Sequence, residues 1–353
     1  MMEASAAPWN IHRGRADGAA ASEVGVGLVK SEDSRRGYSA AMSTATNSPN
    51  DNRVAVRVGI IAGSGIAEAL EDGLRPEATE TVTPDTPFGS PGSPVLLGQY
   101  GATPIAVIQR HGIGHVIGPS QVPYRANLFA LKAVGCTHVL ATGACGSLQE
   151  HIHPGSLVFC DQFLDRTVHR PRTFYEHAAV HVEFDEPTCP VMRRWLRAAA
   201  DPGREVHDGG TYVCIEGPSF STRAESLVHR QWGGDVVGMT AMPEARLARE
   251  AEMAYALVAL PTDYDCWRER PPGATKESLI REIIGHLAEA RTAFFELLRA
   301  ALADTAVLRA DPSPAHAALD LGIWTDKTRI PDAEIERLRP LWGRHFDHAA
   351  ATT

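Results

Sequence analysis

The sequence has no long hydrophobic run and no cluster of basic residues. No apolar stretch reaches the roughly 18 residues needed to cross a bilayer, and no apolar segment follows the basic residues near the N-terminus. The formal net charge is −9, from 34 Lys and Arg against 43 Asp and Glu. Because a general nucleic-acid surface needs clustered cations, we expect neither nucleic-acid nor membrane binding, and instead a soluble cytoplasmic protein.

Cysteine pairs at metal-binding or redox spacing are also absent. The six cysteines are scattered, and no two of them form a C-x-x-C motif. Several lie inside apolar, strand-like runs, which is typical of reduced, buried thiols. The sequence therefore predicts no disulfide framework and no metal site.

The composition divides the chain into three regions. Residues 1–53 are rich in Ala, Ser, Gly and Asn and predict a disordered leader. Residues 54–303 alternate continuous apolar runs with helical patterns, which indicates an α/β domain with a largely parallel or mixed sheet buried on both faces. Its last helix is expected over 276–303. Residues 304–353 form a C-terminal extension, in which an apolar stripe behind Pro331 predicts one short helix near 331–342.

A glycine-rich turn follows the first expected strand, in "GIIAGSGI" (residues 59–66). A dinucleotide fingerprint would need a third glycine where Glu68 stands, and the lysine of a nucleotide-triphosphate loop is missing. What remains is a turn whose backbone N–H groups and Ser64 hydroxyl suffice to hold one phosphate. A glycine turn without any ligand is the alternative interpretation.

Two further strand ends carry small or basic residues. "QRHGIGH" (109–115) places Arg110 beside His111 and ahead of His115, and "ATGACGSL" (141–148) allows close backbone approach to a ligand. The planar guanidinium of arginine suits phosphate, and histidine can add a donor. These strand ends could converge on one oxyanion, although an Arg-His pair in a surface loop is the alternative.

Eight blocks between about Val58 and Leu298 carry a resemblance to a known family. They are "VGIIAGSGI", "TPFGSP", "RHGIGHVIGPSQVPYRAN", "GCTHVLATGACGSL", "DQFLDRT", "YVCIEGPSFSTRAES", "GMTAMPEARLARE" and "TDYDCW". In order and content they resemble the trimeric purine nucleoside phosphorylase family and, within it, the branch that uses 5′-methylthioadenosine. The resemblance implies one α/β domain on a twisted mixed, largely parallel sheet flanked by helices, and a homotrimer with active sites near subunit boundaries. In the implied reaction, inorganic phosphate attacks C1′ of a purine nucleoside without a metal or other cofactor.

The resemblance also implies roles for individual residues. Asp263 and Asp265 would read the edge of the base and serve catalysis, with Asp263 as general acid toward N7. Solvated turn aspartates are the alternative for this pair. The implied phosphate site consists of Ser64, Arg110, His111, the backbone of Gly143 and Ala144, and Thr240. The remaining implied nucleoside contacts are His115, Phe220, Ser221, Met239 and Leu279.

Two departures from the family pattern bear on the substrate. Gly143 stands where threonine is common, and Lys276 stands where an apolar residue commonly lines the pocket for the 5′-substituent. The 5′-methylthio preference therefore rests on fewer residues than the adenine preference. The alternatives are a phosphorylase acting on adenosine, methylthioinosine or 6-oxopurine nucleosides, and a catalytically silent nucleoside-binding protein. Relatives that use 6-oxopurines carry Asn in place of Asp263, which argues against that alternative.

Overall fold

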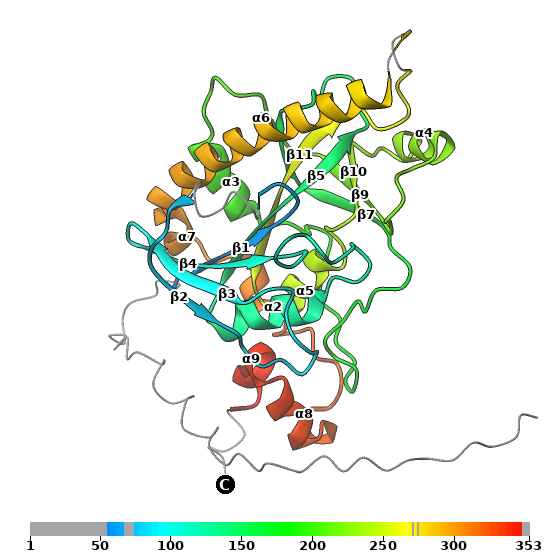
Figure 1. The fold of residues 1–353 in the computed structure, drawn as a ribbon. Helices are drawn as coiled ribbons and strands as arrows, with labels where there is room; N and C mark the ends of the chain where they lie inside the picture. The colour runs from blue at the N-terminus through cyan, green and yellow to red at the C-terminus, as the bar shows by residue number, and fades with distance from the viewer. Residues whose placement is uncertain (1–54, 67–73, 270–271, 274, 348–353) are drawn as a thin grey trace, which may run out of the picture. The chain divides into compact units, whose positions relative to one another are not determined.

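The computed structural model describes residues 55–66, 74–269, 272–273 and 275–347 (Figure 1). The disordered leader expected over 1–53 lies outside these residues. In the described part of the chain, an eleven-stranded mixed sheet is flanked by helices, which confirms the expected fold class. No helix within these ranges is both long and apolar enough to span a bilayer.

Parallel and antiparallel strands combine in one sheet. Along its main path the strand order is β2-β3-β4-β1-β5-β10-β9-β7, while β11 pairs with β5 and β6, and β6 with β8. The strands are β1 (Val58–Ala62), β2 (Glu77–Val82), β3 (Val95–Tyr100), β4 (Thr103–Gln109), β5 (His138–Ser147), β6 (Leu157–Cys160), β7 (Gln162–Arg166), β8 (Val206–Asp208), β9 (Thr211–Ile215), β10 (Val236–Gly238) and β11 (Ala254–Asp263).

Strand β5 is the centre of this topology, because it changes partners along its length. Its first half runs parallel to β1 on one edge, and the last pair of that ladder joins Ile61 to Ala141. On the same edge, β10 joins antiparallel only at Gly146 and Ser147. The stretch 142–145 therefore has no strand partner there in the described structure. In α/β sheets, ligands bind at such divergence points, beyond the carboxyl ends of parallel strands.

Helices cover both faces of the sheet (Figure 1). On one face, α3 and α6 pack in an apolar cluster that includes Ile60 of β1. On the other face, α2 and α5 pack in a second apolar cluster that includes Ile61, the next residue of the same strand. This two-sided burial explains why the strands read as continuous apolar runs. The helices are α2 (Tyr124–Ala133), α3 (Pro190–Ala199), α4 (Arg223–Gln231), α5 (Glu244–Glu250), α6 (Lys276–Ala303), α7 (Ala306–Ala310), α8 (Asp332–Arg337) and α9 (Arg339–Trp342).

The C-terminal extension corrects one expectation. The single helix expected near 331–342 is two short helices, α8 and α9, separated at Leu338, whose backbone is not helical (φ −109°, ψ 15°). Pro340 lies at the start of α9 and has no N–H with which to continue the hydrogen bonding of α8. The apolar stripe was interpreted correctly, because Trp342 is fully buried and stacks on Tyr175.

Candidate active site

Residues of the expected phosphate site lie together beyond the ends of β1 and β4 and beside the middle of β5. The chain turns after β1, where the Ile66 N–H donates to the Gly63 carbonyl. A methyl group on Gly63 would lie 2.7 Å from Nη1 of Arg110 and 3.2 Å from Cα of Gly143. A methyl group on Gly143 would lie 3.3 Å from Oγ1 of Thr240. The structure therefore brings Gly63, Arg110, Gly143 and Thr240 close together, and the region beside them is the expected anion space.

Arg110 is fully buried at this point and already makes three hydrogen bonds. Its Nε and Nη2 donate to the two carboxylate oxygens of Glu244 at 2.7 and 2.9 Å, and its Nη1 donates to the Thr142 carbonyl at 2.8 Å. Burial alone would lower the pKa of Arg110, but the Glu244 carboxylate raises that pKa above its ordinary value. A guanidinium has five N–H donors, so Nη1 and Nη2 each keep one for an anion.

His111 follows Arg110, and its surroundings determine which ring nitrogen carries the proton. Nδ1 lies 2.8 Å from the Ile117 carbonyl, so a neutral ring donates there and leaves Nε2 as an acceptor. Burial, with the charge of Arg110, lowers the pKa of His111 to about 4. His115 is exposed, and its ring lies 4.4 Å from that of His111. At neutral pH, His111 can therefore accept a hydrogen bond from a protonated phosphate oxygen.

The two other expected phosphate contacts lie at the margins of this space. Ser64 is half-buried inside the glycine turn, directly after Gly63. Ala144 is half-buried on β5, in the stretch that has no strand partner on its β1 edge. Both positions suit backbone N–H contacts to an anion, and their phosphate-binding role stays a prediction.

The aspartate pair lies at the end of β11, next to β5. Asp263 is opposite Gly146, and a methyl group on Gly146 would lie 3.4 Å from Oδ1 of Asp263 and 3.1 Å from Cβ of Asp265. Asp263 accepts hydrogen bonds from the Thr262 hydroxyl (2.8 Å) and the Asp265 N–H (2.7 Å). Burial above all, with the charge of Asp265, raises the pKa of Asp263. A carboxyl group with a raised pKa is suited to donate a proton.

Oδ2 of Asp265 and Oγ of Ser221 are buried at this end, and neither atom has a hydrogen-bond partner among the described residues. The two segments also touch, because the Cys266 thiol donates to the Ser221 carbonyl at 3.1 Å. Asp265 has a φ of +50°, which an L residue rarely adopts. Strain and unpaired polar atoms are typical of a ligand site, and the structure places both where the base contacts were expected.

The three apolar residues expected at the nucleoside differ in their placement. Met239 is half-buried, and its Sδ would lie 2.6 Å from a methyl group on Gly217. Phe220 is 86% exposed in the single chain. Leu279 is half-buried in the first turn of α6, whereas Leu287, two turns later, would lie 2.9 Å from a methyl group on Gly65. The structure thus brings Leu287 of α6 to the glycine turn, and the role of Leu279 stays a prediction.

Sequence reasoning missed the residues that hold this site in shape. Glu244 and Tyr255 support Arg110, since the Tyr255 hydroxyl donates to Oε1 of Glu244 at 2.9 Å. Arg170 donates to the carbonyls of Met239 and Glu216 at 2.7 Å each. Glu244 is the last residue of the motif "GMTAMPE". The sequence offered one indication of its role: an acidic residue in an apolar stretch needs a partner when it is buried.

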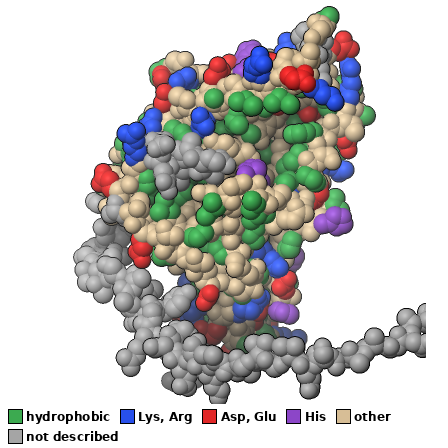
Figure 2. Space-filling model, in the orientation of Figure 1, with side chains coloured by type: hydrophobic (Ala, Val, Ile, Leu, Met, Phe, Trp, Pro, Cys, Tyr) green, Lys and Arg blue, Asp and Glu red, His purple; other side chains and the backbone are tan. Residues whose placement is uncertain are grey.

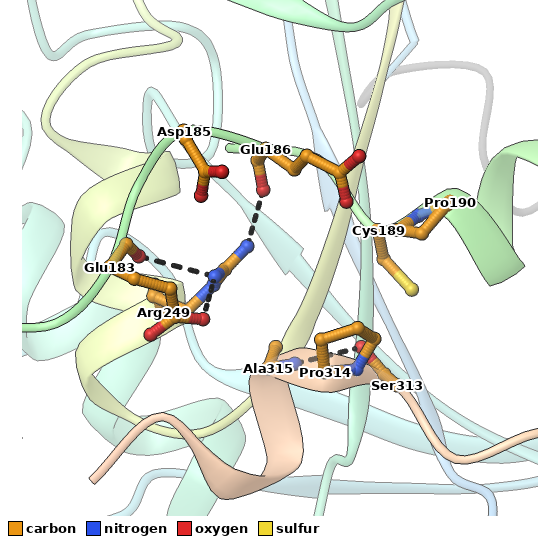
Figure 3. A pocket seen from close by; sticks show the side chains of 9 residues that line it. All are labelled: Glu183, Asp185, Glu186, Cys189, Pro190, Arg249, Ser313, Pro314 and Ala315. Atoms are coloured by element: carbon orange, nitrogen blue, oxygen red, sulfur yellow. Dashed lines mark hydrogen bonds and ion pairs between the residues drawn. The ribbon is translucent and has the colours of Figure 1, made fainter. Parts of the chain in front are cut away.

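A separate cavity of about 110 Å³ shares no lining residue with this site (Figure 3). Arg249 projects into it from α5 and donates to the carbonyls of Glu183 and Glu186 and to the carboxylate of Glu183. These bonds tie the 183–186 loop to α5.

One group of side chains in the described residues has the spacing of metal ligands. Its members are Glu252, Asp320 and His345. Arg344 donates to both oxygens of Glu252 and to Asp320, so one guanidinium bridges the two carboxylates. This cluster fastens the C-terminal extension to the domain.

Comparison with known proteins places the chain in a class and then in a family. The model described as "Phosphorylase superfamily" matches residues 57–303. The S-methyl-5′-thioadenosine phosphorylase of Synechocystis sp. is 40% identical over 85% of this chain and 91% of its own length, and that of Thermosynechococcus vestitus is 41% identical over 82% and 99%. A methylthioadenosine phosphorylase from an antarctic soil metagenomic library is similar in structure, with a TM-score of 0.70 at 38% identity over 81% of this chain and 99% of its own. The chain belongs to the phosphorylase superfamily and, within it, to the family of S-methyl-5′-thioadenosine phosphorylases. A methylthioadenosine phosphorylase from Schistosoma mansoni in complex with adenine is also similar (TM-score 0.64, 35% identity, 81% of this chain and 99% of its own).

Proposed function

We propose that the protein catalyses the phosphorolysis of 5′-methylthioadenosine to adenine and 5-methylthioribose 1-phosphate, as a pentosyltransferase. The observation that carries this proposal is the position of Asp263. It lies at the end of β11, which pairs with β5, and Gly143 of β5 lies close to Arg110. One end of the site offers donors for an anion, and the other offers a carboxyl group for a base. The names of the curated relatives support the same substrate.

The charges that develop in the reaction match these two ends. A phosphate oxygen forms a bond to C1′ while the bond from C1′ to N9 breaks, and the electron pair of that bond goes to the base. Asp263 delivers a proton to N7 of the leaving adenine, a role that its raised pKa favours. The proton lost by hydrogen phosphate balances the one that the base gains, and Nε2 of His111 can accept the phosphate O–H. Fixed donors around Arg110 hold the phosphate in line with C1′.

Adenine is the base that this arrangement favours. Its 6-amino group and protonated N7 both donate hydrogen bonds, whereas the 6-oxo group of hypoxanthine would face the Asp263 oxygens with its own lone pairs. A phosphorylase acting on 6-oxopurine nucleosides is therefore disfavoured, and adenosine remains the alternative substrate. A silent nucleoside-binding protein would not need an arginine buried next to an anion site, which argues for catalysis.

Inorganic phosphate is the proposed co-substrate, and we propose that no metal takes part. The groups at the proposed anion site are a guanidinium, backbone N–H groups and hydroxyls, which can donate to phosphate oxygens, and an imidazole nitrogen, which can accept from a phosphate O–H. Unchanged activity after dialysis against EDTA would support this proposal, and loss of activity restored by one divalent metal would refute it.

We further propose that the chain works in the cytoplasm as a homotrimer. Ile113, Val116, Val168 and Phe220 are exposed large apolar side chains in loops beside the site. Hydrophobic side chains also gather on the face shown in Figure 2. Contiguous exposed apolar surface is typical of subunit interfaces. Light scattering on the active protein tests the assembly, and an active monomer would refute it.

The experiment for the proposed function is an assay of base release. The protein is incubated with 5′-methylthioadenosine, with and without phosphate, and free adenine is measured. Release that depends on phosphate is expected. Release at the same rate without phosphate would indicate hydrolysis and contradict the proposal.

A further inference from the structure

Arg110 lies in a buried network whose other members do not touch the proposed anion space. Glu244 is fully buried in the first turn of α5, 134 positions after Arg110 in the sequence, and accepts two parallel hydrogen bonds from its guanidinium. Tyr255, buried on β11, donates its hydroxyl to Oε1 of Glu244. Burial and the Glu244 carboxylate raise the pKa of Tyr255 well above its ordinary value, so the phenol is a permanent donor.

This network determines which edge of the guanidinium faces the anion space. Glu244 occupies the edge formed by Nε and Nη2, while the Thr142 carbonyl takes one donor of Nη1. Nη1 is the Arg110 atom nearest to Gly63, at 2.7 Å from a methyl group built there. The two donors left over sit on Nη1 and Nη2, on the side away from Glu244. A free arginine side chain would sample many orientations, whereas this one is fixed before any ligand arrives.

We infer that Glu244, itself oriented by Tyr255, is a positioning residue that aims Arg110 at the phosphate co-substrate. The inference rests on the proposed function, because it assigns the role within that same site. Glu244 does not touch phosphate in this account and acts only through the guanidinium. Its carboxylate also balances the charge of a buried arginine when the site is empty, which an uncharged partner could not do.

The test separates phosphate dependence from stability. Glu244→Gln keeps the size of the side chain but can accept only through one oxygen, and Tyr255→Phe removes one hydroxyl while keeping the carboxylate. We expect Glu244→Gln to lower kcat/KM for inorganic phosphate about 100-fold, as loss of a preorganised donor does. For Tyr255→Phe we expect a loss of about three- to tenfold, corresponding to one hydrogen bond. The equilibrium binding of adenine should change less than about threefold in both variants, since Asp263 and Asp265 are untouched.

Glu252 offers a matched control. It is a buried carboxylate that accepts a bidentate pair from Arg344, outside the site. Glu252→Gln should lower the melting temperature, but less than Glu244→Gln does because Arg344 is about half exposed, and it should leave the KM for phosphate unchanged.

The possible outcomes distinguish a failure of this inference from a failure of the proposed function on which it rests. A wild-type protein that binds no phosphate and releases no adenine overturns the proposed function. An active wild type whose Glu244→Gln and Tyr255→Phe variants keep the wild-type KM and kcat for phosphate overturns the role of Glu244 alone. That role is also overturned if Glu244→Gln merely loses stability like the Glu252→Gln control. Should Glu244→Gln fail to fold, Tyr255→Phe decides between the two results.

Discussion

Gly63 and Arg110 are so close that no side chain fits between them: a methyl group on Gly63 would lie 2.7 Å from Nη1 of Arg110. Such a methyl group would also contact the Thr142 carbonyl, which accepts a hydrogen bond from the same Nη1. A backbone carbonyl and a fully buried guanidinium cannot both yield without disturbing β5. The glycine at the end of β1 is therefore required first by the Thr142 carbonyl of β5, which would lie nearest to the methyl group, and also by the arginine that donates to that carbonyl.

Gly63→Ala should impair the use of phosphate. The methyl group displaces the guanidinium by a fraction of an ångström to an ångström, and such misplacement can cost about 100-fold in rate. We expect kcat/KM for phosphate to fall by that order, with adenine binding unchanged, in steady-state kinetics and calorimetry. Gly285→Ala in α6 is the control, because nothing lies within 4 Å of a methyl group there. Equal activity of the two variants would show that Arg110 is not held as described.

Arg110→Met should destabilise the fold as well as abolish phosphate use. It leaves Glu244 as a buried carboxylate without its cation, which costs about 3–5 kcal/mol in the free energy of unfolding. Adding Glu244→Leu removes the stranded charge, so the double variant should recover much of that stability while staying inactive. Urea unfolding of the three proteins measures this. Single and double variants of equal stability would contradict the account.

The stability of the fold should fall in acid through histidines that are buried neutral. His138 is fully buried at the start of β5, its Nε2 has no partner among the described residues, and burial lowers its pKa to about 3. The unfolded chain binds a proton near pH 6.5, so this contribution is complete above pH 6.5 and is lost as the pH falls toward 3. The slope is at most about 1.4 kcal/mol per pH unit.

His138→Leu tests this directly, because leucine does not titrate. The free energy of unfolding of the variant should depend less steeply on pH between 6.5 and 4 than that of the parent. Burial also lowers the pKa values of His111 and His316 and raises the pKa of Glu250, but these three residues are present in both proteins and do not affect the comparison. Parallel curves for parent and variant would mean that His138 is charged in the fold.

Asp263→Asn should change which base is preferred. The amide can donate to a 6-oxo group and still turn its oxygen toward N7–H, whereas the carboxylate can only accept. We expect the ratio of kcat/KM for methylthioadenosine over methylthioinosine to fall by at least about tenfold, with slower adenine release. Asp265→Ala is the comparison, since it should slow turnover without shifting the ratio. If Asp263→Asn keeps the wild-type ratio, the aspartate does not read the base.

Much of the sheet was predictable because burial on both faces leaves a local signature. The continuous apolar runs expected as buried strands in residues 54–303 include those that form β1, β4, β5 and β11. Strands β2, β3, β7 and β8 were missed. The sequences of β2 and β7, "EATETV" and "QFLDR", are mixed in polarity because one side of each strand meets solvent.

The candidate site was predictable only where its residues sit in local motifs. The glycine turn, the Arg110-His111 pair and the Asp263-Asp265 pair each follow a strand, so their positions could be inferred from the sequence. The Glu244–Arg110 pair could not be inferred from the sequence, because the two residues are 134 positions apart and neither motif indicates that it contacts the other. The break between α8 and α9 depends on one proline whose effect outweighed the apolar stripe around it.

The central claim is that phosphate, held at Arg110, displaces adenine that is recognised at Asp263. The most direct measurement is kcat/KM of the full-length protein, at saturating phosphate, for 5′-methylthioadenosine, adenosine, methylthioinosine and inosine, each repeated without phosphate. The account predicts phosphate-dependent release with the 6-amino nucleosides preferred by on the order of 10⁴-fold over their 6-oxo counterparts. Equal use of 6-amino and 6-oxo nucleosides, or base release that does not need phosphate, would contradict it.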